Sequence, residues 1–278
     1  MPSLPLLVCP VCGGSLEPDP DFRSLSCPAG HRYDAAKQGY FNLLTGGGTK
    51  FQADTAAMVQ ARTDFLAAGH YQPMAAELAR LVSAAVPRAG AVLDAGAGTG
   101  YYLGEVLRPL PGAEAVALDI SKYALRRAAR ALPGTYALVW DVWRRLPLRD
   151  ASVDVVLNVF APRNPPEFHR VLAPGGILAV VTPRPEHLQE IRAGAAMLGI
   201  AAEKEERVAA SLSPGFSALH TTQCTYTMQL RTADVRNAVL MGPSARHLEP
   251  DALGRTLAAL PDPVEVTASF TLQIFRAD

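Results

Sequence analysis

The sequence predicts an α/β protein in which a Rossmann-like domain follows a small metal-binding module. Two observations lead to this prediction. An apolar stretch at 91–93 runs into the glycine-rich segment 94–100 and then into helical spacing over 101–107. A strand, a glycine loop and a helix in this order form the ligand cradle of Rossmann-like folds, because glycine lets the backbone approach a ligand closely. Near the N-terminus, cysteine and histidine residues stand in two short pairs, which is typical of a zinc site.

Bulk properties restrict the classes of function that need to be considered. A chain of 278 residues has room for one large domain and a small appendage. Lys and Arg together number 26, as do Asp and Glu, so no overall positive field attracts nucleic acid or anionic lipid. Any RNA contact must therefore come from a local patch. The sequence has neither a long apolar run nor a secretory leader pattern, so we expect a cytoplasmic protein without membrane partners.

The paired cysteines and histidine predict a zinc ribbon. Cys9 and Cys12 stand in Cys-Pro-Val-Cys, and Cys27 and His31 stand in Cys-Pro-Ala-Gly-His. A reducing compartment argues against disulfides, whereas three thiolates and an imidazole suit tetrahedral zinc. Because protein fills all four positions, the ion cannot activate water and should be structural. Residues 15–26 have room for two short strands, so the module would be stabilised by metal rather than by a core of its own.

Composition suggests where the domains begin and end. We predict a zinc-binding RNA-recognition module at 1–44, a linker at 45–54 and a catalytic domain at 55–278. The linker begins with Thr-Gly-Gly-Gly-Thr, a composition that favours flexibility. The aromatic residues Tyr33, Tyr40 and Phe41 near the end of the module have two open interpretations. They stack on RNA bases, or they pack the ribbon onto the next domain.

The glycine loop favours one class of cofactor. A dinucleotide fingerprint requires a third glycine where Tyr101 stands, so that fingerprint fails. The remaining pattern, Asp-x-Gly-x-Gly-x-Gly, is the first motif of class I methyltransferases, which use S-adenosylmethionine. Asp94 suits the cationic amine of that cofactor, and the loop contributes Gly96, Gly98, Thr99 and Gly100.

Two further carboxylates follow predicted strands in the same register. Asp119 ends the strand predicted at 115–119, where it would bind ribose hydroxyls, and Asp141 follows the strand at 136–139, where it would bind the adenine amino group. Strands at 153–157 and 177–181 complete a sheet predicted to be parallel, with the ligand at the carboxyl ends of its strands. Each carboxylate could instead be a simple strand-end cap.

The rest of the sequence predicts further helices and strands but offers few candidate functional residues. Helices are expected at 55–68, 73–86, 185–198 and 233–241, and strands at 219–230 and 264–275. Cys224 lies in one of those strands and is predicted to be core. One set of basic residues forms either an RNA track or an ordinary solvated surface; its members are Lys122, Arg126, Arg130, Arg144, Arg145 and Arg149.

The chain resembles the RlmA-type 23S ribosomal RNA guanine-N1-methyltransferases along its whole length, and especially their TlrB-like branch. The resemblance rests on CPVC at 9–12, CPAGHRYDAAKQGYFNLL at 27–44, AAMVQAR at 56–62, AAGHYQP at 67–73, VLDAGAGTG at 92–100, NVFAPRNPPE at 158–167, LAPGG at 172–176 and TPRPEHL at 182–188.

The resemblance implies transfer of a methyl group from S-adenosylmethionine to N1 of guanine 748 in a domain II hairpin of 23S rRNA, with resistance to tylosin-type macrolides. It also implies that the zinc module and a homodimer hold the RNA, and that Tyr71, Gly98, Thr99 and His187 contact the cofactor. The residues alone predict Tyr71 as core and His187 as a helix-surface residue.

Chemistry at the methyl acceptor points to the segment after the strand at 153–157. Guanine N1 carries a proton at neutral pH, so the enzyme needs a base or a group that stabilises the guanine carbonyl. Asn158 and Arg163 are the candidate catalytic residues, with Arg163 opposing charge on the guanine oxygen. Phe160 is a candidate to receive the unstacked base. The alternative is a small-molecule methyltransferase, which would share the glycine loop but would not need a zinc ribbon.

Overall fold

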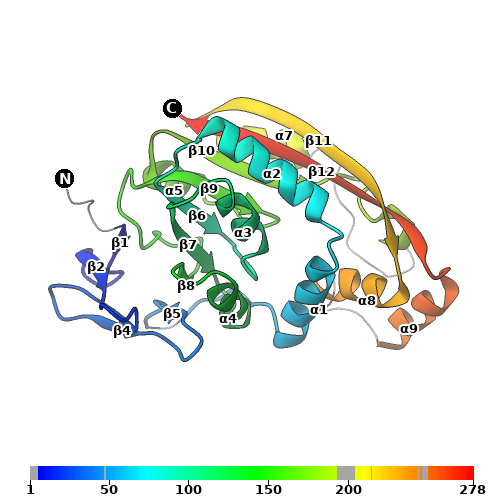
Figure 1. The fold of residues 1–278 in the computed structure, drawn as a ribbon, viewed down its shortest axis with the longest axis horizontal. Helices are drawn as coiled ribbons and strands as arrows, with labels where there is room; N and C mark the ends of the chain where they lie inside the picture. The colour runs from blue at the N-terminus through cyan, green and yellow to red at the C-terminus, as the bar shows by residue number, and fades with distance from the viewer. Residues whose placement is uncertain (1–5, 47, 193–203, 214, 243–244, 246–249) are drawn as a thin grey trace.

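The structure is a computed structural model that describes residues 6–46, 48–192, 204–213, 215–242, 245 and 250–278. Its main feature is an eight-stranded sheet in the order β11-β12-β10-β9-β6-β7-β8-β5 (Figure 1). The strands are β5 (Phe41–Asn42), β6 (Ala91–Ala95), β7 (Glu114–Asp119), β8 (Tyr136–Val139), β9 (Val153–Val159), β10 (Leu172–Pro183), β11 (Phe216–Leu230) and β12 (Val264–Ala277).

The sheet is mixed, so the prediction of a parallel sheet is only partly correct. The six strands from β5 to β10 run parallel to one another. β12 is antiparallel to both β10 and β11. The chain leaves β11 and enters β12 at the same end, where Leu230 pairs with Val264, so these two strands must run in opposite directions. Cys224 is half-buried on β11 and packs against the core, as predicted.

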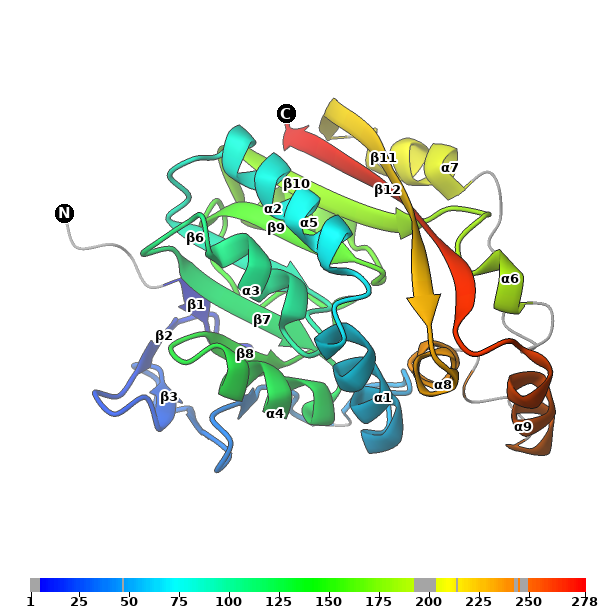
Figure 2. The same cartoon turned by 45° about the vertical axis from the view of Figure 1, so that its right-hand side comes forward.

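Helices cover both faces of the sheet (Figure 2). One face packs against α2 (Gln72–Ala85), α3 (Tyr101–Leu107) and α4 (Lys122–Ala131), whereas α1 (Ala56–Ala67), α8 (Thr232–Leu240) and α9 (Pro250–Ala259) lie beyond the ends of the strands. The other face packs against α5 (Pro165–Val171) and α7 (Lys204–Leu212). Strands buried on both faces read as continuous apolar runs, which is why 91–93 and 153–157 were recognisable as strands.

Most predicted helices are present, and one begins later than expected. In the region predicted as a helix at 185–198, the described helix is the short α6 (Gln189–Arg192). Leu188 has a φ of 57°, which a right-handed helix does not allow, so no regular helix runs through it. Residues 193–198 lie outside the described residues. The sequence did not predict α5, α7 or α9.

The zinc module is a four-stranded antiparallel sheet of β1 (Leu7–Val8), β2 (Ser15–Pro18), β3 (Ser24–Ser26) and β4 (Arg32–Asp34). β2 and β3 confirm the two strands expected within 15–26. The module is bonded to the connection between β8 and β9: Val8 donates its N–H to the carbonyl of Pro147 at 3.0 Å, and Arg149 donates its N–H to that of Leu6 at 3.1 Å.

Apolar side chains of the module belong to the same hydrophobic cluster as one face of the large sheet. Phe41 is fully buried on β5, an edge strand of that sheet, although it lies inside the predicted module at 1–44. Tyr33 is also buried, whereas Tyr40 is half-buried beside a cavity. For Tyr33 and Phe41 the structure therefore favours packing over base stacking. Within the described ranges, no helix has both the length and the apolar character to cross a membrane.

Candidate functional site

The four predicted zinc ligands converge at one end of the module. One ligand atom from each residue lies within 4.8 Å of the other three, in the set Cys9, Cys12, Cys27 and His31. The sulfurs of Cys12 and Cys27 are 3.6 Å apart, and Cys27 Sγ is 3.4 Å from His31 Nδ1. This donor set suits a closed, structural zinc site.

Asp94 lies at the carboxyl end of β6 in an environment that does not satisfy its charge. The residue is completely buried, and within the described structure neither carboxylate oxygen has a hydrogen-bond partner. Burial raises the pKa of Asp94 to about 8, and the nearby Asp119 carboxylate adds to the shift. A buried carboxylate is ionised at little cost only when a cation pairs with it, and Asp94 has no such partner within the described structure. The ammonium group of S-adenosylmethionine would supply one.

The glycine loop fits closely against the segment that follows β9. Gly96 has a φ of 98°, and a Cβ at this position would lie 2.3 Å from the Cβ of Ala161. Only glycine can therefore bring the loop so near to 158–163. Gly98 and Gly100 also have positive φ, Gly100 is the N-cap of α3, and Thr99 is buried between them.

The second predicted cofactor carboxylate is bonded to the loop itself. Asp119 accepts hydrogen bonds from the N–H of Gly98 at 2.8 Å and from the N–H of Ser121 at 2.7 Å. Burial raises the pKa of Asp119, and these two bonds oppose the shift. The same carboxylate thus fixes the shape of the glycine loop and stands at the strand end where ribose hydroxyls were expected.

The predicted adenine ligand is tied to the linker. Asp141 is buried and accepts hydrogen bonds from the hydroxyl of Thr49 at 2.7 Å and from the N–H of Trp143 at 3.0 Å. Arg144 donates to the carbonyl oxygen of Gly48. The segment predicted as a flexible linker is therefore attached to the edge of the cofactor region by side-chain contacts.

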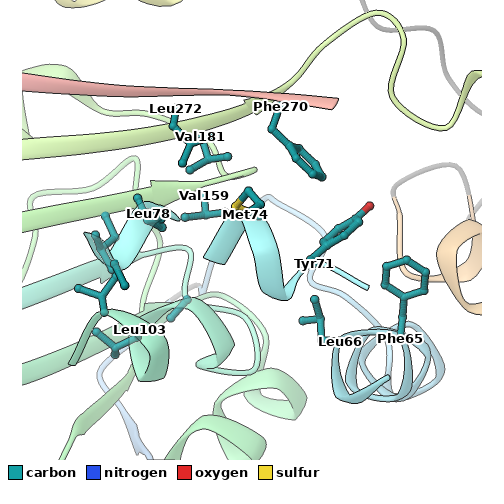
Figure 3. Close-up of a cluster of buried hydrophobic side chains, with 14 of the residues drawn as sticks. Phe65, Leu66, Tyr71, Met74, Leu78, Leu103, Val159, Val181, Phe270 and Leu272 are labelled. Carbon is teal, nitrogen blue, oxygen red and sulfur yellow. The ribbon is translucent and has the colours of Figure 1, made fainter. Parts of the chain in front are cut away.

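Tyr71 and His187 meet although they are 116 residues apart in the sequence, with 2.9 Å between the Tyr71 hydroxyl and His187 Nε2. His187 Nδ1 accepts a hydrogen bond from the N–H of Ser269 at 3.3 Å, so the proton of a neutral ring lies on Nε2 and is donated to Tyr71. Tyr71 points between α1 and Phe270 of β12 (Figure 3). Tyr71 is core, as its residue type predicted. His187 is 7% exposed, so the prediction of a helix-surface residue is wrong.

The candidate catalytic residues surround the loop after β9. Asn158 is fully buried, and its Nδ2 donates to the carbonyls of Ala95 at 3.2 Å and Pro162 at 2.8 Å. Among described residues its Oδ1 has no partner. Arg163 is half-buried, and within the described chain it forms no ion pair or hydrogen bond; burial lowers the pKa of its guanidinium. Phe160 is 41% exposed.

An aromatic cluster connects this loop with the Tyr71–His187 pair. The Phe160 ring centroid lies 6.3 Å from that of Tyr71, 5.9 Å from that of Tyr102 and 5.6 Å from that of Phe270. An exposed ring beside buried rings forms an apolar surface on which a planar base can stack. The cluster and the two polar residues Asn158 and Arg163 flank the same loop.

Sequence reasoning missed two residues at this site, Arg62 and Thr49. Arg62 forms an ion pair with Asp54 at 2.7 Å, and a Cβ added at Gly98 would lie 3.8 Å from its guanidinium. It therefore brings a positive charge to the glycine loop from α1. Spacing from the loop gives no signal for either residue, because α1 and the linker reach the site only through tertiary folding. The segment 56–62, quoted for the family resemblance, was the available hint for Arg62.

The basic residues proposed as an RNA track do not act as one free surface. Arg145 forms an ion pair with Asp150 at 3.3 Å, and Arg149 donates to the Ser15 hydroxyl at 3.0 Å. Arg144 is fixed to the linker. Lys122 and Arg130 on α4 are exposed, and Arg126 is half-buried. The second half of the set therefore has structural partners.

Comparisons with known proteins agree with this geometry. Residues 92–176 match the family described as "Methyltransferase domain", and residues 7–45 match the family described as "RlmA, N-terminal". A 23S rRNA (guanine(748)-N(1))-methyltransferase of Streptomyces fradiae is 45% identical, over 97% of this chain and 96% of its own. A Micromonospora griseorubida protein, provisionally named a 23S rRNA (guanine-N(1)-)-methyltransferase, is 49% identical over 98% of both chains.

Solved structures support the fold of the catalytic domain. The [4+2]-cyclase SpnF superposes with a TM-score of 0.53 at 20% identity, over 82% of this chain and 99% of that chain. The predicted fold class is confirmed, as are dependence on S-adenosylmethionine and the zinc ribbon.

Proposed function

Because the chain belongs to the RlmA-type 23S rRNA guanine-N1-methyltransferase family, we propose that it methylates N1 of guanine 748 in a domain II hairpin of 23S rRNA. The enzyme would act in the cytoplasm, and the modification would give resistance to tylosin-type macrolides. The observation that carries the proposal is the near full-length relationship to the Streptomyces fradiae enzyme, which spans the zinc module as well as the catalytic domain. A small-molecule methyltransferase would need only the latter.

The cofactor site is assembled from this chain's own charges. S-adenosylmethionine supplies an electrophilic methyl group on a sulfonium. We assign Asp94 to its ammonium group, because that carboxylate is buried and unpartnered within the described structure. Arg62, which lies near Gly98, would face the cofactor's carboxylate. Asp119 and Asp141 would accept from the ribose hydroxyls and the adenine amino group, with Tyr71 and His187 closing the apolar side.

The acceptor side depends on Asn158 and Arg163. Asn158 uses its Nδ2 to hold the carbonyls of Ala95 and Pro162, which leaves Oδ1 to accept a hydrogen bond from an N–H of the target guanine. Arg163 would oppose the negative charge that develops on the guanine oxygen as the N1 proton leaves. Phe160 would stack on the base after it leaves its helix. Precise alignment and exclusion of water then account for much of the rate.

The zinc module and a second subunit would position the RNA. The module packs on the same hydrophobic cluster as the catalytic sheet, so it holds a fixed orientation relative to the candidate active site. We propose a homodimer in which two such modules contact one hairpin.

The experiment is methyl transfer from labelled cofactor to 23S rRNA of a strain that lacks this modification. We expect label in the RNA and a reverse-transcription stop at guanine 748, because an N1-methyl group blocks base pairing. Label in a small metabolite instead, or a stop at another guanine, would contradict the proposal. Expression in a sensitive host, followed by growth on tylosin, tests the resistance, and sedimentation tests the dimer.

A further inference from the structure

Two large aromatic side chains lie exposed beside the linker, away from the aromatic cluster around Phe160. Phe51 is 42% exposed and Trp143 is 50% exposed. Their ring centroids are 6.3 Å apart with 33° between the planes. Exposed aromatic residues that lie together are typical of interaction surfaces, since burying them in the protein's own core would be more favourable.

A buried carboxylate holds both aromatic residues in place. Asp141 accepts the N–H of Trp143 at 3.0 Å and the hydroxyl of Thr49 at 2.7 Å, and Thr49 in turn accepts the N–H of Phe51 at 3.2 Å. The two rings are therefore presented by a connected hydrogen-bond network and do not depend on a flexible tether. Such preorganisation reduces the entropy lost on binding.

The surroundings of the two rings are basic. The Nζ of Lys50 lies 5.5 Å from the Phe51 ring centroid, and Arg144 is held at the carbonyl of Gly48. The carboxylate that lines the same cavity, Asp141, is buried with two donors, and Asp54 pairs with Arg62 at 2.7 Å. This local positive charge is the kind of patch that a chain with equal numbers of acidic and basic residues needs in order to bind RNA.

The rings also border a cavity. A cavity of about 670 Å³ is lined by Gly48, Lys50, Phe51, Asp141, Trp143 and Arg144. A second cavity, of about 310 Å³, adjoins it at Gly48 and extends to Lys122 and Tyr123. Lys122 Nζ lies 5.4 Å from the Tyr123 ring centroid. Each cavity is thus lined by an aromatic ring with a lysine ammonium near it, a combination typical of proteins that bind unpaired nucleotides.

We propose that this surface, formed by Lys50, Phe51, Trp143 and Arg144, binds an unpaired nucleotide of the RNA by stacking its base on Trp143 and Phe51 while the two cations contact its phosphates. The proposal rests on the proposed function, because it requires an RNA substrate. The nucleotide bound here is not the target guanine, since the candidate acceptor site lies at the separate cluster around Phe160. The cofactor's adenine, which is assigned to Asp141, would border the same cavity, so the test is made with the cofactor site filled.

Tryptophan fluorescence tests whether an RNA base stacks on this surface. The chain has two tryptophans, and Trp140 is only 5% exposed, so quenching by a stacked base reports on Trp143. We expect a synthetic RNA hairpin of the 23S domain II sequence to cause further quenching of the zinc-loaded full-length protein after it has been saturated with S-adenosylhomocysteine. Trp143→Phe should lose the quenching yet bind the hairpin within about threefold of the unaltered protein. If the hairpin causes no further quenching of the protein saturated with S-adenosylhomocysteine, no RNA base stacks on this surface and the proposal is overturned.

Affinity measurements complete the test. Phe51→Ala and Trp143→Ala should each weaken hairpin binding about tenfold, in line with roughly 1–3 kcal/mol for a stacked base. Leu219→Ala, which removes an exposed apolar side chain from β11, is the matched control and should bind normally. Zinc content, thermal unfolding and cofactor affinity are measured for each variant to exclude misfolding.

If the unaltered protein methylates 23S rRNA while both alanine variants bind the hairpin as well as it does, the proposed RNA-binding surface is wrong and the proposed function stands. If it transfers no methyl group to 23S rRNA, the function itself fails.

Discussion

The zinc module and the catalytic sheet are stabilised in different ways. The four strands of the module are only two to four residues long, and its described ligands gather within 4.8 Å of one another. The catalytic sheet instead has strands that are buried on both faces by packed helices. A metal can replace a core in a small unit, whereas a large core tolerates a destabilising group such as the unpartnered Asp94. The two regions nevertheless share one hydrophobic cluster, so they should not unfold independently.

Loss of zinc should have the largest effect. Cys12→Ser removes one ligand of the cluster, and zinc binding in such modules contributes about 10–16 kcal/mol. We expect loss of bound zinc and a lower unfolding temperature for the whole chain, still in one transition. Elemental analysis and thermal unfolding measure these effects. Cys224→Ser, which lies outside the cluster on β11, should keep its zinc; a Cys12→Ser protein with a full complement of zinc would refute the ligand set.

The junction between the two regions should be nearly as sensitive to a core substitution. Phe41 is fully buried on β5, and its ring centroid lies 5.8 Å from that of Phe22. Phe41→Ala should lower the free energy of unfolding by about 3–5 kcal/mol, because a large cavity would form in the shared cluster. Urea unfolding with its neighbour Asn42→Ala as the exposed control measures this. Separate transitions for the module and the sheet in the unaltered protein would show that they are independent.

Substitution of Asp94 should weaken cofactor binding while the protein still folds. Asp94→Asn should weaken binding of S-adenosylmethionine about a hundredfold, because the cofactor's ammonium loses a buried ionic partner. Calorimetry in buffers of different ionisation enthalpy gives a second readout. With a pKa of about 8, Asp94 is mostly protonated at pH 7 without the cofactor, so binding should release close to one proton. Asp94→Asn should abolish that release; unchanged affinity and proton release would remove Asp94 from the site.

The same carboxyl group affects stability with a definite sign. Its pKa is raised to about 8 in the folded chain and is near 4 in the unfolded chain. Between these values the folded state binds more protons, so the contribution of Asp94 to the free energy of unfolding falls as pH rises from about 4 to about 8. The cofactor-free Asp94→Asn protein should therefore lose less stability over this range than the unaltered protein does. Thermal unfolding at several pH values tests the sign.

The contact between the linker and Asp141 should give the smallest effect. Thr49→Val removes the hydroxyl that bonds to this buried carboxylate at 2.7 Å. The loss should be about 1.5–3 kcal/mol in the free energy of unfolding, as for hydrogen bonds to charged groups. Thr45→Val changes an exposed linker residue and serves as the control in the same urea experiment. Equal stability of the two variants would mean that the linker is not anchored at Thr49.

The sequence by itself determined the features that depend on residues close together in the chain. The two knuckles of the zinc cluster each span a few residues, so residue type and spacing were sufficient to identify them. The glycine loop was recognisable because Gly96, Gly98 and Gly100 adopt positive φ within one turn, and apolar runs marked the strands from β6 to β10 because those strands are buried on both faces.

Only the tertiary structure decided what distant segments do together. It turned β12 antiparallel to β10, added β5 of the predicted zinc module to the catalytic sheet, and brought His187 to Tyr71. It also attached Thr49 to Asp141 and directed Arg62 toward Gly98. Local patterns report burial and backbone conformation, whereas these contacts depend on how separate elements pack, and no spacing along the chain encodes that packing.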